Sequence, residues 1–138
     1  MLKIIGSQIT HDEGDARMEF ITEGRYAEEK GSVLLSYDES ELSGIEGCTT
    51  SLCIKDGKIK MERYGGLIGV DTAIEFEQGR RFKGYYDTPF GSVEMELLTN
   101  FVEDNIERKN VSGYLSIDYN ICLKGLAESR SRLKIEII

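Results

Sequence analysis

The chain has 138 residues, of which 40% are hydrophobic and 30% charged, and it carries a formal net charge of -8. This length and balance fit a single soluble domain over residues 1–138, which buries roughly two-thirds of the surface of the unfolded chain. The negative charge excludes nucleic acid and anionic membranes as general partners, because binding to phosphates depends on lysine and arginine.

The first residues carry no targeting signal. The N-terminus turns polar after five residues, whereas a signal peptide needs an apolar core of roughly 7–15. No apolar run approaches the roughly 20 residues of a membrane helix. We therefore expect a cytoplasmic protein. Its cysteines, Cys48, Cys53 and Cys122, lack the paired spacing of a zinc or redox site and are expected to be buried free thiols.

Apolar and polar residues alternate along most of the chain, which is typical of strands with one buried and one exposed face. Turn-forming residues recur every eight to twelve positions. The predicted strands cover residues 2–4, 18–26, 33–37, 52–55, 58–61, 70–76, 82–86, 92–98, 115–123 and 127–137. Leu98 breaks the alternation and indicates a bulge or an exposed contact. No convincing helix is visible: residues 94–107 are the best candidate, but their alternation fits a strand better than a helix.

The clearest local signal is Asp56-Gly57, a two-residue turn of the kind that joins hairpin strands, because glycine tolerates the positive φ that it requires. This turn places Ile54 opposite Ile59 and Thr50 opposite Arg63. The apolar pairs fall on one face, so Arg63 points to the apolar side.

A second hairpin is predicted around residues 78–80, with Phe76 opposite Phe82 and Thr72 opposite Tyr86. A loop one residue longer would place Arg81 on the inner face instead. Many hairpin-connected strands favour closure, because a barrel leaves no exposed edges. The sequence therefore predicts an all-β, antiparallel, mostly up-and-down β-barrel of about eight to ten strands.

Several motifs in order resemble the YwiB-like family of small bacterial proteins over nearly the whole chain. They are Leu35-Ser-Tyr-Asp-Glu-Ser-Glu, Gly44-Ile-Glu-Gly-Cys-Thr-Thr, Arg63, Phe76-Glu-Gln-Gly-Arg, Tyr86-Asp-Thr-Pro-Phe-Gly and Ser131-Arg-Leu-Lys-Ile. The resemblance implies a calycin-like (lipocalin-like) barrel and no established activity. Cys48 departs from the threonine usual at its position in that family, which weakens any catalytic role for the thiol.

Polar side chains on the predicted inner face mark the candidate ligand site. A buried charge needs a partner, so Arg63 is expected to pair with Glu39 or with an anionic ligand group. Phe90, beside the single proline Pro89, is a candidate lid at the rim, although a tight turn explains this segment without function. The candidate ligand-binding residues are Arg63, Tyr37, Glu39, Thr50, Thr72, Tyr86 and Phe90.

No catalytic or metal-binding residue is assigned. The acidic residues Asp38, Glu39, Glu41 and Glu46 lack the spacing of a calcium loop and are interpreted as a solvated loop. His11, the single histidine, lies in a polar turn and builds neither a metal cluster nor a nucleophile pair.

Three functions remain open, and none of them requires a cofactor. The first is non-catalytic binding of a small, partly apolar ligand with an anionic group. The second is a structural or interaction role with a filled core, in which an outer face that includes Leu98 contacts a partner or a second copy in a homodimer. The third is a hydrolase or isomerase that uses the acidic loop.

Overall fold

The computed structural model describes residues 1–10, 14–39, 47–65, 72–88, 91–124 and 127–138. Within these ranges the chain forms eleven β-strands, and no helix there is long and apolar enough to cross a membrane. The strands are β1 (Leu2–Thr10), β2 (Gly14–Thr22), β3 (Gly24–Glu29), β4 (Ser32–Asp38), β5 (Cys48–Lys55), β6 (Lys58–Gly65), β7 (Thr72–Glu77), β8 (Arg81–Thr88), β9 (Gly91–Glu107), β10 (Ser112–Leu123) and β11 (Ala127–Ile137).

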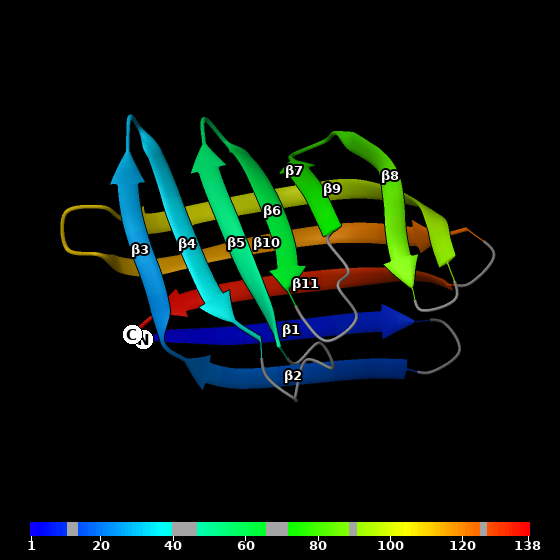
Figure 1. The fold of residues 1–138 in the computed structure, drawn as a ribbon, viewed down its shortest axis with the longest axis horizontal. Coiled ribbons are helices and arrows are strands. Elements are labelled where there is room, and N and C mark those ends of the chain that lie inside the picture. The colour runs from blue at the N-terminus through cyan, green and yellow to red at the C-terminus, as the bar shows by residue number, and fades with distance from the viewer. Residues whose placement is uncertain (11–13, 40–46, 66–71, 89–90, 125–126) are drawn as a thin grey trace.

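The strands form two antiparallel sheets. A six-stranded sheet has the order β2-β1-β11-β10-β9-β8, and a five-stranded sheet has the order β3-β4-β5-β6-β7. The strands of the five-stranded sheet run across β1, β2, β9, β10 and β11 of the other sheet (Figure 1). The predicted all-β antiparallel fold is confirmed. The predicted barrel closure is wrong, because no ladder between described residues joins β2 to β3 or β7 to β8.

The chain first changes sheet between β2 and β3, which only Glu23 separates. Gly24 lies close to the side chain of Leu2, which would have to move to make room for a Cβ at this position. The predicted continuous strand over residues 18–26 is therefore divided between the two sheets. Corners of this kind let a sandwich with crossed strands pass from one sheet to the other.

The second change of sheet, at residues 78–80, replaces the predicted hairpin. Strand β7 pairs with β6, whereas β8 pairs with β9. The backbone N–H of Gly79 donates to the Thr99 carbonyl at 2.9 Å, and the Thr99 N–H donates to the Arg80 carbonyl at 3.2 Å. The backbone of this turn is thus bonded to β9, and the two predicted partner strands separate into different sheets.

A bulge in β9 reverses which side chains face the core. The β9–β10 register shifts so that Asp118 pairs with Phe101 and Tyr119 with Thr99, which leaves Asn100 as the extra residue. It lies two positions beyond Leu98, where the sequence indicated an irregularity. One extra residue moves the following side chains to the opposite face. The inward set accordingly changes from Met95, Leu97 and Thr99 to Val102 and Ile106.

The hairpin predicted at Asp56-Gly57 is confirmed in every pair. Ile54 lies opposite Ile59, and Thr50 lies opposite Arg63. Positive φ angles of 51° at Asp56 and 77° at Gly57 match the turn that this dipeptide favours. The register of this part of the five-stranded sheet therefore follows from local sequence.

The core lies between the inner faces of the two sheets. Its fully buried side chains come from both, with Leu35, Leu52 and Phe76 in one sheet and Leu115 and Ile135 in the other. The tilted ring of Tyr119 packs against Phe76 with a centroid distance of 5.0 Å, which joins the sheets directly. Burial of these side chains is the main term that stabilises a sandwich of this kind.

A buried carboxylate lies on the outer face of the six-stranded sheet. The side chain of Asp118 is 2% exposed and accepts two hydrogen bonds from Arg130, both at 3.0 Å. It also accepts one from Arg132 at 3.1 Å and one from Asn100 at 2.8 Å. Burial alone would raise the pKa of Asp118, but the hydrogen bonds from Arg130, Asn100 and Arg132 bring it below its ordinary value.

Substitution of Asp118 by asparagine is expected to lower the free energy of unfolding at pH 7 by about 1–2 kcal/mol, because the half-exposed arginines lose a charged acceptor. A lowered folded-state pKa stabilises the fold above the unfolded-state pKa, near 3.9. The difference from the wild type should therefore shrink as the pH falls below about 4. Urea unfolding at several pH values measures it, with the exposed Asp38→Asn as control; a gap independent of pH would contradict this account.

Candidate functional site

The inner face of the five-stranded sheet carries a row of polar residues at one level. In the register, Tyr37 of β4 pairs with Thr50 of β5, Thr50 pairs with Arg63 of β6, and Arg63 pairs with Thr72 of β7. Three of the residues that the sequence indicated, Tyr37, Thr50 and Arg63, have their side chains in this row, whereas for Thr72 the structure describes only the backbone pairing. The Asp56-Gly57 turn fixes the Thr50–Arg63 part, because its register sets the whole hairpin.

Glu39, directly after β4, joins this row. Its backbone N–H donates to the Cys48 carbonyl at 2.9 Å, which keeps the residue beside β5. Its Oε1 accepts a hydrogen bond of 2.6 Å from the Thr50 hydroxyl and lies 3.8 Å from Nε of Arg63. Arg63 Nε also donates to the Thr50 hydroxyl at 3.4 Å. The predicted Arg63–Glu39 pair is therefore present, with Thr50 between the two charges.

The pair is asymmetric in its exposure to solvent. The side chain of Glu39 is 2% exposed, whereas that of Arg63 is 28% exposed. The contacts of Arg63 with Glu39 and Thr50 run through its Nε. A planar guanidinium in this position can bind a carboxylate or phosphate through its terminal nitrogens.

Tyr37 is fully buried beside this pair. Burial raises the pKa of its phenol far above the usual value, and the nearby Glu39 carboxylate adds to the effect. The hydroxyl lies near Thr50 and Glu39 but completes no hydrogen bond of good geometry with the described residues. Tyr37 therefore stays neutral, and its ring packs edge-on against Phe20 at 6.3 Å.

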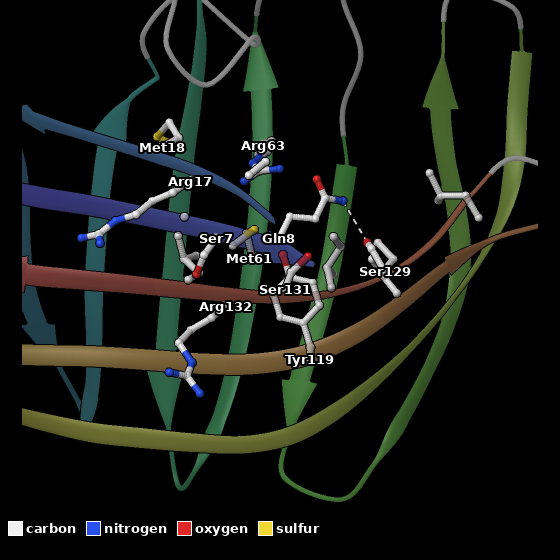
Figure 2. Close-up of a pocket in the computed structure, with 16 residues that line it drawn as sticks. Ser7, Gln8, Arg17, Met18, Met61, Arg63, Tyr119, Ser129, Ser131 and Arg132 are labelled. Atoms are coloured by element: carbon white, nitrogen blue, oxygen red, sulfur yellow. Dashed lines mark hydrogen bonds between the residues drawn. The ribbon is translucent and has the colours of Figure 1, made fainter. Parts of the chain in front are cut away.

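Arg63 also lines a cleft of about 570 Å³ between the two sheets, which is open to solvent. Figure 2 shows its lining side chains, which come from β1, β2, β10 and β11 on one side and from β6 and β7 on the other. The lining residues are Gly6, Ser7, Gln8, Ala16, Arg17, Met18, Met61, Arg63, Ile74, Tyr119, Ile121, Leu123, Ser129, Ser131, Arg132 and Leu133.

The cleft is open because its floor carries small side chains. Gly6 and Ala16 in neighbouring strands, with Ser129 and Ser131 in β11, face the space that larger residues fill elsewhere in the core. A Cβ on Gly6 would lie 3.2 Å from the terminal methyl of Met18, so even alanine would crowd this wall. Ser7, Arg17 and Arg132 alternate with these inward residues, and strand alternation directs their side chains to the outer face.

The chemistry of the cleft is mixed. Met18, Met61, Ile74, Ile121 and Leu133 supply an apolar surface. The Gln8 amide donates a hydrogen bond of 2.8 Å to the Ser129 hydroxyl, which Figure 2 shows as a dashed line. No aspartate or glutamate is among the described residues that line the cleft, although the chain has 25 acidic residues and 17 basic ones. The cleft therefore favours an anion over a cation.

Not every predicted site residue lies at this cleft. Arg63 lines it, whereas Tyr37, Glu39 and Thr50 lie behind Arg63 as its support. Thr72 and Tyr86 belong to β7 and β8, but the positions of their side chains lie outside the described part of the structure, as does Phe90. The candidate lid and rim of the cleft thus remain predictions.

The sequence interpretation missed most of the cleft residues. Ser129 and Ser131 precede Leu133 and Ile135 with the same alternation, so their inward position was visible in the sequence. Gln8 likewise lies an even number of residues after Leu2 and Ile4 in β1, so strand alternation directs it to the same inner face. These cleft residues could have been predicted from the sequence, because each is a polar residue on a strand face that is otherwise apolar.

The described residues contain no group of three or more histidine, cysteine, aspartate or glutamate side chains placed to hold a metal ion. His11, Glu41 and Glu46 lie outside the described residues. Asp38 instead accepts a hydrogen bond from Thr49 at 3.0 Å on the exposed side of the sheet. The cysteines are free, as predicted, but Cys48 and Cys53 are half-buried and Cys122 is exposed, so their predicted burial is wrong.

Comparison with known proteins places the chain in a family. A model described as "Domain of unknown function (DUF1934)" matches residues 2–135. The crystal structure of the ywiB protein from Bacillus subtilis is similar in fold, with a TM-score of 0.71 and 20% sequence identity over 98% of this chain and 89% of that chain. No curated protein sequence matches. The chain therefore belongs to the DUF1934 family, whose function is unknown, as its resemblance to the YwiB-like proteins predicts.

Proposed function

We propose that this protein binds a small amphipathic anion in the cleft between its sheets. The observation that carries the proposal is the lining of the cleft, in which apolar side chains, neutral hydrogen-bonding groups and the guanidinium of Arg63 meet without a described acidic residue. A volume of about 570 Å³ lies within the usual range of small-molecule sites. The anionic group of the ligand would bind Arg63, and its apolar part would contact Met61, Ile74 and Ile121.

The proposed role is binding without a reaction. The described polar groups of the cleft are an amide, hydroxyls and a guanidinium, and none of these is a usual general base. The acid closest to Arg63 is Glu39, which is buried behind it and bonded to Thr50. As part of the same proposal, the protein acts in the bacterial cytoplasm, where its free thiols stay reduced.

Binding of the amphipathic aryl sulfonate 1-anilinonaphthalene-8-sulfonate, followed by fluorescence, tests this proposal. We expect Arg63→Met to weaken its binding about tenfold or more, because a charged hydrogen bond is lost. Binding of the uncharged analogue N-phenyl-1-naphthylamine should change much less. Arg81→Met, which removes an exposed arginine of β8 paired with Glu96, is the matched control.

A second variant tests the cleft without touching Arg63. Ser131→Phe places a large ring on the floor of the cleft and should abolish binding of both probes, while circular dichroism shows an unchanged fold. If Arg63→Met and Ser131→Phe both bind the sulfonate as the wild type does, the cleft is not its site. The proposal is then wrong, and a structural role for the Arg63–Glu39 pair is favoured.

A further inference from the structure

Strand β2 forms one edge of the six-stranded sheet and is nine residues long. It pairs with β1 on one side, and no described strand pairs with it on the other. An edge strand of this length presents backbone N–H and C=O groups on which another strand can be added. Ile21, with 57% of its surface exposed, adds an apolar side chain close to this edge.

The charges of β2 are complementary to those of a second β2. Arg17 and Glu19 lie on the outer face, on either side of Met18. When two copies pair antiparallel about a two-fold axis at Met18, Arg17 of each copy lies opposite Glu19 of the other. Opposite charges directly across a strand pair are favourable, and like charges are unfavourable.

The alternative registers are less favourable. In the dimer, the six-stranded sheets of the two copies must turn their inner faces to the same side. Only registers in which residues directly opposite each other have the same orientation meet this condition. A shift that centres the axis on Arg17 places the two Arg17 side chains opposite each other. A shift that centres it on Glu19 does the same with the two Glu19 side chains. A shift that centres it on Ala16 places Arg17 opposite Asp15, but it pairs only residues 14–18 of β2, whereas the register at Met18 pairs the whole strand, Gly14–Thr22. The register at Met18 therefore combines opposite charges with the longest pairing.

The proposed ligand cleft reaches this same edge. Ala16 and Met18 of β2 line it, and Met18 is the residue at the two-fold axis. Addition of a second copy would bring a second Met18 against the first and place the two clefts side by side across the axis. The wall of each cleft would then be extended by the partner.

Two of the other described edges, β3 and β8, are less suited to this pairing. Strand β3 is six residues long, ends in Glu28-Glu29, and does not line the cleft. Strand β8 carries the exposed residues Arg81 and Lys83, which would repel a second copy in several registers.

We propose that two copies of this chain associate through antiparallel pairing of their β2 strands, centred on Met18, into a continuous twelve-stranded sheet built from the two six-stranded sheets. Two symmetric Arg17–Glu19 pairs fix the register. The association does not depend on a ligand, so it can be tested separately from the function of the cleft.

Sedimentation equilibrium of the full chain tests the association. The wild type is expected at twice the 15.6 kDa mass of one chain. The variant Arg17→Glu places the new glutamate opposite Glu19 of the other copy at both symmetric positions, and Glu19→Arg places the new arginine opposite Arg17 in the same way. Each single variant should raise the dimer Kd about tenfold or more, because two attractive pairs become repulsive.

Mixing the two single variants gives the decisive result. In the mixed dimer, the two glutamates of one copy lie opposite the two arginines of the other, so the equimolar mixture should dimerise again. The matched controls are Arg81→Glu and Glu96→Arg, which lie in β8 and β9 near the other edge of the same sheet. Both variants should stay dimeric. Circular dichroism of each variant confirms that it is folded.

Three outcomes would overturn the proposal. They are a wild type that remains a monomer at the highest attainable concentration, single variants that dimerise as the wild type does, and a mixture that stays monomeric while the wild type is dimeric. Within one copy, Glu19 also bonds Lys3 at 2.9 Å and Arg17 at 3.2 Å. The mixture therefore separates loss of the dimer contact from loss of these bonds.

Discussion

Replacement of Gly113 by alanine is expected to lower the free energy of unfolding by about 3 kcal/mol or more. Gly113 has a φ of 104°, which residues with a Cβ rarely adopt. A Cβ there would also overlap the backbone carbonyl of Asn105 in β9. Neither strand can move easily, because β10 is paired on both sides here, with Gly113 opposite Ile106 of β9 and Ile137 of β11. Urea unfolding followed by far-ultraviolet circular dichroism measures the loss.

Gly57→Ala is the matched control for this prediction. Gly57 also has a positive φ, 77°, but a Cβ there would meet no atom within 4 Å. Its replacement should cost only the backbone strain of a left-handed residue, about 1–2 kcal/mol. If the two variants lose equal stability, the close contact with β9 contributes nothing, and the account of Gly113 is wrong.

Arg63→Met is expected to lower the free energy of unfolding by about 2 kcal/mol, because it leaves the buried Glu39 carboxylate without its cation. The full cost of breaking a buried pair is not expected, since Arg63 is 28% exposed and solvent screens part of the attraction. Thr50 still donates its hydrogen bond of 2.6 Å to Glu39, which limits the loss further. Thermal and urea unfolding measure the change.

The double variant Glu39→Gln with Arg63→Met should recover most of this stability, because a neutral amide needs no cation. It should not recover binding of the anionic probe, since the guanidinium is still absent. The comparison therefore separates the two roles of Arg63. Loss of stability without recovery in the double variant would contradict the pairing with Glu39, and recovery of binding would contradict the contact between Arg63 and the ligand.

The polar row at the cleft could be predicted largely from local sequence patterns. Alternation and the Asp56-Gly57 turn placed Thr50 opposite Arg63 and directed both inward, and the structure confirms each step. The same alternation carried Tyr37 and Glu39 toward them. These inferences succeeded because each depends on strand periodicity and on one turn, which are properties of short segments.

Longer-range features followed from contacts that periodicity does not encode. The turn at residues 78–80 was predicted to close a hairpin, but its backbone hydrogen bonds go to Thr99, about 20 residues further along the chain. The change of sheet at Glu23 brings Gly24 against the side chain of Leu2, which comes from another strand. Strand alternation encodes neither change of sheet, and the two changes separate the strands into two sheets rather than a closed barrel.

The sequence alone determined the antiparallel all-β class, the inward face of most strands and the charge pair behind the cleft, because alternation and turn chemistry act between near neighbours. Only the tertiary structure decided where the sheets separate, that Gly6, Ala16, Ser129 and Ser131 come together on the floor of a cleft, and that this cleft reaches the edge strand β2. The physical reason is that a cavity arises where small side chains from strands distant in the sequence meet, and their meeting depends on the packing of the whole sandwich.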